Sequence, residues 1–284
     1  MDRYWLPRSE LWRGREIKWG VWGEGPPVVL LHGTPWSSVL WQRTARRLAA
    51  SYRVYAWDMP GYGQSSKDPR YAVDLGVQSQ AFADLLELWR LEQPHVIAHD
   101  IGGAVGLRTR LLGERTFASL CLVDVVALRP WGSPFFRLVQ QHSEVFEQLP
   151  AAIHRGALEA YIRGASHAGL SEEELAALAA PWLEETSGQS AFYRQIAQAD
   201  ERFTAEIEGD LGRIDEPVHI IWGQEDTWIP PDRATRLQDA IPGSTLRLVP
   251  DAGHLIQLDA PEVLDAELER WLAEVKQRAR RSAR

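Results

Sequence analysis

Residues 96–106 read Val-Ile-Ala-His-Asp-Ile-Gly-Gly-Ala-Val-Gly, and the rest of the chain is organised around them. The apolar run that ends at Ala98 is typical of a buried strand, and the apolar stretch after Gly102 is typical of a helix. A very sharp turn between the two needs small residues at Ala98 and Gly102, because strand and helix pass close to each other there. The pattern small-x-acid-x-small predicts a nucleophile elbow with Asp100 at its tip.

On these residues alone, two other interpretations of the stretch stay open. The simpler one is an ordinary connection between a strand and a helix with an acid at its corner. A dinucleotide-binding loop fits less well, because the Gly-x-Gly spacing is missing before Gly102.

Composition narrows the class of protein. The 284 residues suit one large α/β domain with an insertion, or two domains, and the net charge of −8 argues against a nucleic-acid partner. Cys121 is the only cysteine, so the chain forms no internal disulfide and no cysteine-based zinc site. Residues 1–15 lack the apolar run of a signal peptide, and no spanning segment is visible, so we expect a cytoplasmic protein without membrane association.

Apolar segments alternate with helical patterns in the first half of the chain. We expect strands at 17–21, 28–31, 52–57, 96–98 and 119–123, and helices at 41–50, 75–91 and 103–112. This alternation predicts a parallel sheet with helices on both faces. The alternation stops at 127–209, which has helical patterns separated by prolines, and returns with strands at 218–222 and 245–249 and helices at 232–240 and 261–278. We therefore expect a core formed by residues 1–126 and 210–284 and an inserted helical cap at 127–209.

Covalent catalysis needs a nucleophile, a base and an acid that orients the base. Asp100 is the candidate nucleophile. His254 follows the last strand and a tight glycine turn, which is where the base is expected. Two acids follow strands that end at the same edge of the sheet. We favour Asp226, after the strand 218–222, and keep Asp124, after the strand 119–123, as the alternative.

An oxyanion also needs donors, and backbone N–H groups supply them at such an elbow. Ile101 directly follows the nucleophile, and Thr34 follows the pair His32-Gly33 at the end of an early strand. We expect the N–H groups of Ile101 and Thr34 to form the oxyanion hole. His32 is expected to be a structural hydrogen-bonding residue.

The chain resembles α/β-hydrolase-fold enzymes over nearly its whole length. The motifs that carry the resemblance are 32–35 (His-Gly-Thr-Pro), 58–65, 98–102, 222–226 and 253–254. With an aspartate at the elbow, the chain resembles one branch of this family, which contains the epoxide hydrolases, haloalkane dehalogenases and fluoroacetate dehalogenases. The resemblance implies an Asp100–His254–Asp226 triad, a small-molecule substrate, and neither a cofactor nor a metal. We expect a monomer or a homodimer.

An aspartate nucleophile selects the chemistry. A carboxylate that attacks an acyl carbon gives an anhydride, which is a poor intermediate, whereas attack at an sp³ carbon gives an alkyl ester. His254 would then activate water against the carbonyl of that ester. The leaving groups that fit are halide and the oxygen of a strained epoxide, so Asp100 argues against an ordinary esterase.

The family's epoxide hydrolases protonate the epoxide oxygen with tyrosines of the cap. Tyr193 resembles the second of these tyrosines, and Tyr161 is a weaker match to the first. His142 is a further candidate donor. Together with Trp36 and Trp131, these cap and loop residues are the expected lining of the substrate pocket.

Two departures from the family patterns bear on the leaving group. Haloalkane dehalogenases usually carry a tryptophan directly after the nucleophile to hold halide, and this chain has Ile101. Fluoroacetate dehalogenases carry arginines soon after the nucleophile, and this chain has Ile101 and Ala104 there. We therefore expect an epoxide-hydrolase-type reaction, with haloalkane or haloacid dehalogenation as the alternative. A protein of this fold that binds a ligand without turning it over is the alternative of another class.

Overall fold

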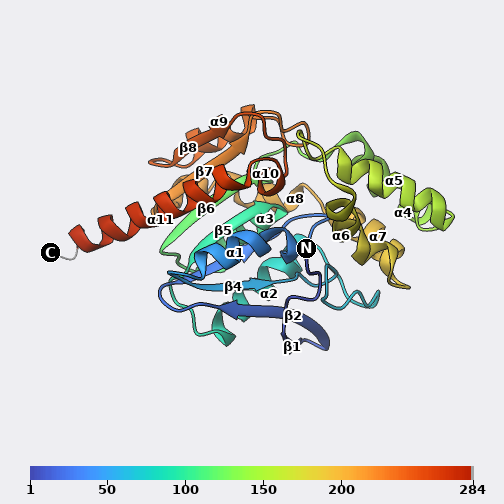
Figure 1. The fold of residues 1–284 in the computed structure, drawn as a ribbon, viewed down its shortest axis with the longest axis horizontal. Coiled ribbons are helices and arrows are strands. Elements are labelled where there is room, and N and C mark those ends of the chain that lie inside the picture. Colours follow the sequence, from blue (N-terminus) through green and yellow to red (C-terminus); the bar gives the residue numbers. More distant parts are fainter. Residues whose placement is uncertain (283–284) are drawn as a thin grey trace.

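The computed structural model describes residues 1–282, and one mixed sheet forms the centre of this part of the chain (Figure 1). Its strands lie in the order β1-β2-β4-β3-β5-β6-β7-β8. The six strands from β3 to β8 are parallel, and β1 and β2 pair antiparallel at one edge. The strand bounds are β1 Arg8–Trp12, β2 Arg15–Trp22, β3 Pro27–Leu31, β4 Arg53–Trp57, β5 His95–Asp100, β6 Ser119–Val125, β7 Val218–Gly223 and β8 Thr245–Val249. The mostly parallel sheet that the sequence predicted is confirmed.

Helices cover both faces of the sheet, because the buried strands are apolar on both sides. In β3, Val28 and Leu30 pack with residues of α1 (Gln42–Leu48) and α11 (Pro261–Ser282). Val29 and Leu31 point to the opposite face and pack with residues of α2 (Leu75–Leu88), α3 (Ile101–Leu111) and α9 (Asp232–Ala240). The period of two along the strand therefore separates two apolar cores.

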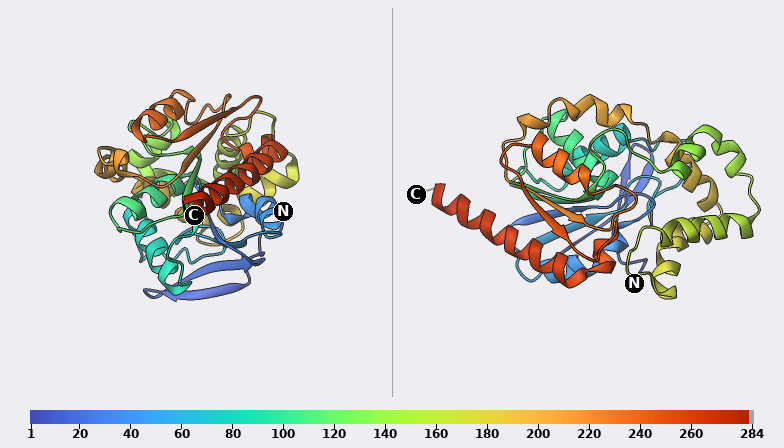
Figure 2. Two further views of the ribbon diagram at one scale, coloured as in Figure 1. Left: turned by 90° about the vertical axis from the view of Figure 1, so that its left-hand side faces the viewer. Right: turned by 90° about the horizontal axis from the view of Figure 1, so that it is seen from above.

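The chain between β6 and β7 is helical and lies at one end of the sheet, opposite the end from which α11 projects (Figure 2). This helical segment lies over the carboxyl ends of the parallel strands, because the chain enters it directly from the end of β6. Its helices are α4 Pro134–Phe146, α5 Ala151–Arg163, α6 Glu172–Leu183, α7 Gly188–Gln198 and α8 Arg202–Glu208, followed by the short 3-10 helix η2 Leu211–Arg213. We call α4 to α8 the cap.

The structure corrects several expected elements. The strand expected at 17–21 is β2, and an unexpected strand, β1, pairs outside it through a turn in which Arg13 and Gly14 both have positive φ. The short helices α8, α10 (Ile256–Asp259) and η1 (Ser38–Trp41) were not expected. Elements this short show too few turns for periodicity to reveal them. Within residues 1–282, no helix combines the length and apolarity needed to cross a membrane.

Candidate active site

Asp100 lies at the junction of β5 and α3 in a strained backbone conformation, with φ 54° and ψ −127°. A non-glycine residue with positive φ costs free energy and persists only where its surroundings hold it. The carbonyl of Asp100 accepts a hydrogen bond from the N–H of Val126 at 2.9 Å. Space is equally tight, because a Cβ on Gly102 would lie 2.5 Å from the carbonyl oxygen of His32, and one on Gly33 would lie 2.3 Å from the Cβ of Asp100. The elbow therefore requires glycine at both positions.

The two oxygens of the Asp100 carboxylate have different surroundings. Oδ1 accepts a hydrogen bond from the N–H of Thr34 at 2.6 Å. The N–H of Ile101 also donates to this carboxylate. Oδ2 lies 3.4 Å from Nε2 of His254. One oxygen is thus held by a backbone donor of the expected oxyanion hole, and the other faces the expected base.

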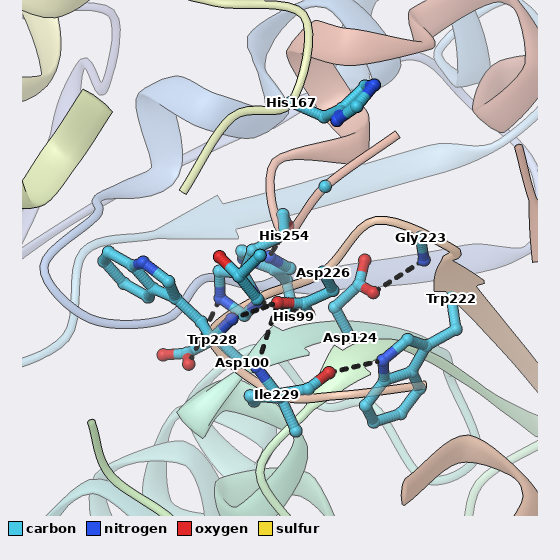
Figure 3. Close-up of polar contacts among 12 residues, drawn as sticks. His99, Asp100, Asp124, His167, Trp222, Gly223, Asp226, Trp228, Ile229 and His254 are labelled. Atoms are coloured by element: carbon cyan, nitrogen blue, oxygen red, sulfur yellow. Dashed lines mark hydrogen bonds and ion pairs between the residues drawn. The ribbon is translucent and has the colours of Figure 1, made fainter. Parts of the chain in front are cut away.

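His254 connects Asp100 to Asp226 (Figure 3). Its Nδ1 lies 2.9 Å from Oδ2 of Asp226, and both of these side chains are fully buried. Oδ1 of Asp226 accepts the N–H groups of Trp228 and Ile229 at 2.8 and 2.9 Å. The end of β5 and the loops that follow β7 and β8 therefore bring the candidate nucleophile, acid and base into one chain of contacts.

Electrostatics favour an ion pair in the resting state. Burial lowers the pKa of His254, but the charges and hydrogen bonds of Asp226 and Asp100 outweigh burial and raise this pKa well above its usual value. Burial likewise works against ionisation of Asp100, and the hydrogen bond and charge of His254 overcome it, so the pKa of Asp100 is lowered. An anionic Asp100 beside a protonated His254 follows.

Asp124, the alternative acid, does not contact the His254 ring through a hydrogen bond. Its Oδ1 accepts the N–H of Gly223 at 2.8 Å (Figure 3). Burial, followed by the nearby charge of Asp226, raises the pKa of Asp124 well above its usual value. The geometry thus gives the orienting position to Asp226.

Two buried histidines flank the site with structural contacts. His32 contacts the carbonyl of Gly33 through Nδ1 at 2.9 Å, and its Nε2 accepts the N–H of Met59 at 2.9 Å. His99 was not singled out by the sequence. Its Nε2 donates to the carbonyl of His254 at 2.9 Å, and burial lowers the pKa of His99 to about 3, so its ring is neutral. His99 therefore holds the backbone of His254 in place without supplying charge.

A small cavity of about 30 Å³ lies beside Asp100 and beneath the cap. Among the residues expected in the site, Thr34, Asp100, Ile101, Trp131 and Tyr161 line it. The ring of Tyr161 stacks on Trp228, with 4.3 Å between centroids. The remaining lining residues are Val126, Gly132, Ser133, Phe136, Trp228 and Ile229.

The structure places three expected pocket residues away from this cavity. The hydroxyl of Tyr193 lies 2.9 Å from Nδ1 of His154, inside the cap, and burial raises the pKa of Tyr193 to about 12. His142 is exposed at a kink in α4. Trp36 is buried behind Trp228, with 5.6 Å between the stacked rings, and does not line the cavity. These expectations are corrected because packing between helices, which the sequence pattern does not reveal, turned these side chains elsewhere.

Gln195 and Tyr62 form hydrogen bonds that connect the cap to Thr34, in the loop after β3. Neither residue was expected in the site. The side-chain oxygen Oε1 of Gln195 accepts hydrogen bonds from Oγ1 of Thr34 at 2.5 Å and from the Tyr62 hydroxyl at 2.9 Å. Gln195 belongs to α7, and Tyr62 follows β4. In the sequence, Gln195 is only a glutamine in a segment predicted to be helical. The sequence does not show that its side chain faces Thr34. Within the described residues, no cluster of three or more His, Cys, Asp or Glu side chains is arranged to hold a metal ion.

Comparison with known proteins agrees with this geometry. Residues 26–261 match the family described as alpha/beta hydrolase fold. A crystal structure of an alpha/beta hydrolase fold protein from Burkholderia ambifaria is 45% identical, with a TM-score of 0.90 over 93% of this chain and 97% of that chain. The haloalkane dehalogenase DatA from Agrobacterium tumefaciens C58 has a similar fold, with a TM-score of 0.78, 21% identity, and coverage of 94% of this chain and 96% of that chain.

A curated relative is the dihydrolipoyllysine-residue acetyltransferase component of the acetoin cleaving system of Pseudomonas putida. It is 27% identical over 272 residues, which cover 90% of this chain and 66% of that protein. The chain thus spans just under two thirds of the length of this relative. With the family match over residues 26–261, the chain belongs to the alpha/beta hydrolase fold family and is a hydrolase of that superfamily.

Proposed function

We propose that the protein hydrolyses a small molecule at an sp³ carbon through an ester between that carbon and Asp100, in an epoxide-hydrolase-type reaction. The observation that carries the proposal is the asymmetry of the Asp100 carboxylate. Oδ1 is held by the N–H of Thr34 at 2.6 Å, and Asp100 lines the cavity. Oδ2 is the oxygen left to attack an electrophile that enters there.

In the first step, Oδ2 of Asp100 attacks an epoxide carbon, the C–O bond of the ring breaks, and the ring oxygen takes a proton. Tyr161 is the phenol that lines the cavity with Asp100, and its hydroxyl contacts Ser133. Burial and the charge of Asp100 raise the pKa of Tyr161, so its hydroxyl carries a proton at neutral pH. Tyr161, the weaker of the two sequence matches, is therefore the proposed donor in place of Tyr193.

In the second step, water attacks the ester carbonyl of Asp100 and gives its proton to His254. The charge that develops on the carbonyl oxygen is stabilised by the N–H groups of Thr34 and Ile101. His254 must be neutral for this step. Ester formation removes the negative charge of Asp100, which is one of the causes that raise the pKa of His254. The first step thereby prepares the base for the second, because the proton that His254 loses returns to the phenolate of Tyr161. Collapse of the tetrahedral intermediate breaks the bond between the carbonyl carbon of Asp100 and the alkoxy oxygen. That oxygen takes the proton of the hydroxyl group added from water, so the diol leaves and the Asp100 carboxylate is restored.

Halide release is the alternative outcome, and binding without turnover is the outcome of another class. Three of the residues that line the cavity offer halide no free side-chain donor. The hydroxyl of Thr34 is bonded to Gln195, the indole N–H of Trp131 donates to Thr204 at 2.9 Å, and Ile101 has no side-chain donor.

The test is a product screen of the purified protein, with Asp100→Ala as the control. Because the cavity is small, the panel starts from the smallest terminal epoxides and proceeds to aryl epoxides, beside bromoalkanes and haloacetates. Diol without halide is expected, and halide release would replace the epoxide proposal. With a competent substrate, a His254→Gln variant should gain the mass of the substrate fragment in intact-protein mass spectrometry. No adduct in this variant would contradict covalent catalysis.

The two cap tyrosines form a matched pair for the proton donor. Tyr161→Phe should lower the rate of ester formation by about 10²-fold, the lower end of what general acid catalysis contributes. Tyr193→Phe removes a hydroxyl that contacts His154 and should leave this rate nearly unchanged. Equal effects of the two substitutions would show that Tyr161 is not the donor.

A further inference from the structure

Asp124 is a buried acid that the proposed mechanism does not use, and its backbone is built in an unusual way. Along β5 and β6, His99 pairs with Val123 and Asp100 pairs with Val125, so Asp124 is an extra residue in a β-bulge. Its φ is 44°, in the left-handed region. A bulge redirects the side chain of the extra residue and is frequent beside active sites. Here it directs the carboxyl of Asp124 toward the acid of the triad.

The Asp226 carboxylate leaves one place for a further donor. A carboxylate offers about four acceptor positions. Two on Oδ1 are taken by the N–H groups of Trp228 and Ile229, and one on Oδ2 is taken by Nδ1 of His254. The remaining position accepts a hydrogen bond only if a neighbour carries a proton.

The Asp124 carboxyl supplies that neighbour. It is in hydrogen-bonding contact with the side chain of Asp226. Its Oδ1 accepts the N–H of Gly223, whereas its Oδ2 is buried and has no hydrogen-bond donor among residues 1–282. Two adjacent buried carboxyl groups do not both ionise, since like charges at that distance repel strongly in a low dielectric. Of the two, Asp226 receives three N–H donors and Asp124 receives one, so the proton belongs to Asp124.

We propose that Asp124 is a positioning residue that keeps its proton and donates it as a hydrogen bond from Oδ2 to the carboxylate of Asp226. The bond fixes the orientation of Asp226 and spreads its negative charge, and so limits how strongly Asp226 raises the basicity of His254. Asp124 acts only through Asp226. The inference deepens the proposed function, because it concerns the acid of the same triad, but the protonation state of Asp124 does not depend on which substrate is turned over.

Asp124→Asn is the decisive variant. The amide oxygen takes the place of Oδ1 opposite Gly223, and the NH₂ group takes the place of the proposed O–H donor. Asparagine also tolerates positive φ well, so the variant is expected to fold. If Asp124 is neutral, this substitution changes no charge. If Asp124 is ionised, the substitution removes a buried negative charge beside Asp226 and His254.

Two measurements on the substrate-free enzyme test the inference. The infrared difference between wild type and Asp124→Asn at neutral pH should contain the C=O stretch of a protonated carboxyl group. An NMR titration of the His254 imidazole, assigned with His254→Gln, should give the same midpoint in both proteins. The groups that face this imidazole are Asp226, Asp100 and the neutral His99.

A carboxylate band in place of the protonated band, or a fall of the His254 midpoint by one pH unit or more in Asp124→Asn, would overturn the inference. Asp124→Ala removes the donor and should raise the His254 midpoint, whereas the asparagine variant restores the wild-type value. A purely structural role for Asp124 would leave the midpoint unmoved in both variants. Because neither measurement uses a substrate, a failed product screen and a failed Asp124 inference are distinguishable.

Discussion

Replacing Asp226 by asparagine is expected to stop hydrolysis of the alkyl-enzyme while its formation continues. Oδ1 of Asp226 accepts two N–H groups, from Trp228 and Ile229, so the amide oxygen of the variant takes this position. The NH₂ group then faces Nδ1 of His254, where a carboxylate oxygen lies at 2.9 Å in the wild type. Since the amide donates to Nδ1, the neutral imidazole carries its proton on Nε2 and does not accept one from water.

The expected loss in the rate of ester hydrolysis follows from the burial of the ion pair between His254 and Asp226. The side chains of His254 and Asp226 are both 0% exposed. Removing one partner of a buried ion pair costs about 3–5 kcal/mol. Because about 1.4 kcal/mol corresponds to a tenfold change in rate, hydrolysis of the ester should slow by roughly 10²–10⁴-fold.

The assay is a single-turnover reaction, quenched at intervals and read by intact-protein mass spectrometry. In Asp226→Asn, the alkyl-enzyme should form at a rate close to that of the wild type, because attack by Asp100 needs no base, and should then accumulate to one equivalent. Asp124→Asn is the matched control and should hydrolyse the ester within a few-fold of the wild-type rate. Wild-type hydrolysis in Asp226→Asn, or an equal loss in Asp124→Asn, would refute the assignment of Asp226 as the orienting acid.

Three further outcomes are expected. Gly33→Ala should lower the rate of ester formation by about 10²-fold and the free energy of unfolding by about 1–3 kcal/mol, because the new Cβ would lie 2.3 Å from the Cβ of Asp100; single-turnover kinetics and denaturant unfolding check this, and an unchanged rate would contradict it. Asp100→Asn should lower the pKa of His254, since the charge and hydrogen bond of Asp100 raise it; an NMR titration measures the shift, and a rise in the pKa would reverse our reasoning. Gln195→Leu leaves the buried hydroxyl of Thr34 without its acceptor and should lower the free energy of unfolding by about 1–3 kcal/mol; Gln195→Glu retains an acceptor and should lose less, and an equal loss would argue against the hydrogen bond as the cause.

The elbow is the part of the site that the sequence predicted most directly, because its requirements are local. A strand, a sharp turn and a helix within residues 95–111 need small residues at fixed spacing from Asp100, and these residues are adjacent in the chain. The alternation of apolar strands and helices likewise predicted the parallel sheet. Since the carboxyl ends of parallel strands meet at one edge, the positions of Asp226 and His254 after later strands could be inferred without coordinates.

The choice between equivalent candidates depended on packing. Asp124 lies in a bulge near the end of β6, and Asp226 follows the neighbouring parallel strand β7. Asp226 contacts His254, whereas Asp124 accepts the N–H of Gly223. No pattern in the sequence predicts this bulge.

The cap shows the same division. Tyr161 and Tyr193 both lie on helices of a segment that the sequence predicted to be helical. Periodicity shows that such helices have an apolar face, but not whether that face meets the nucleophile or another cap helix. The sequence by itself therefore determined the fold, the elbow at Asp100 and the loops that carry the candidate base and its candidate acid. Only the tertiary structure decided which acid, which tyrosine and which cap glutamine reach the site, because these depend on contacts between segments far apart in the chain.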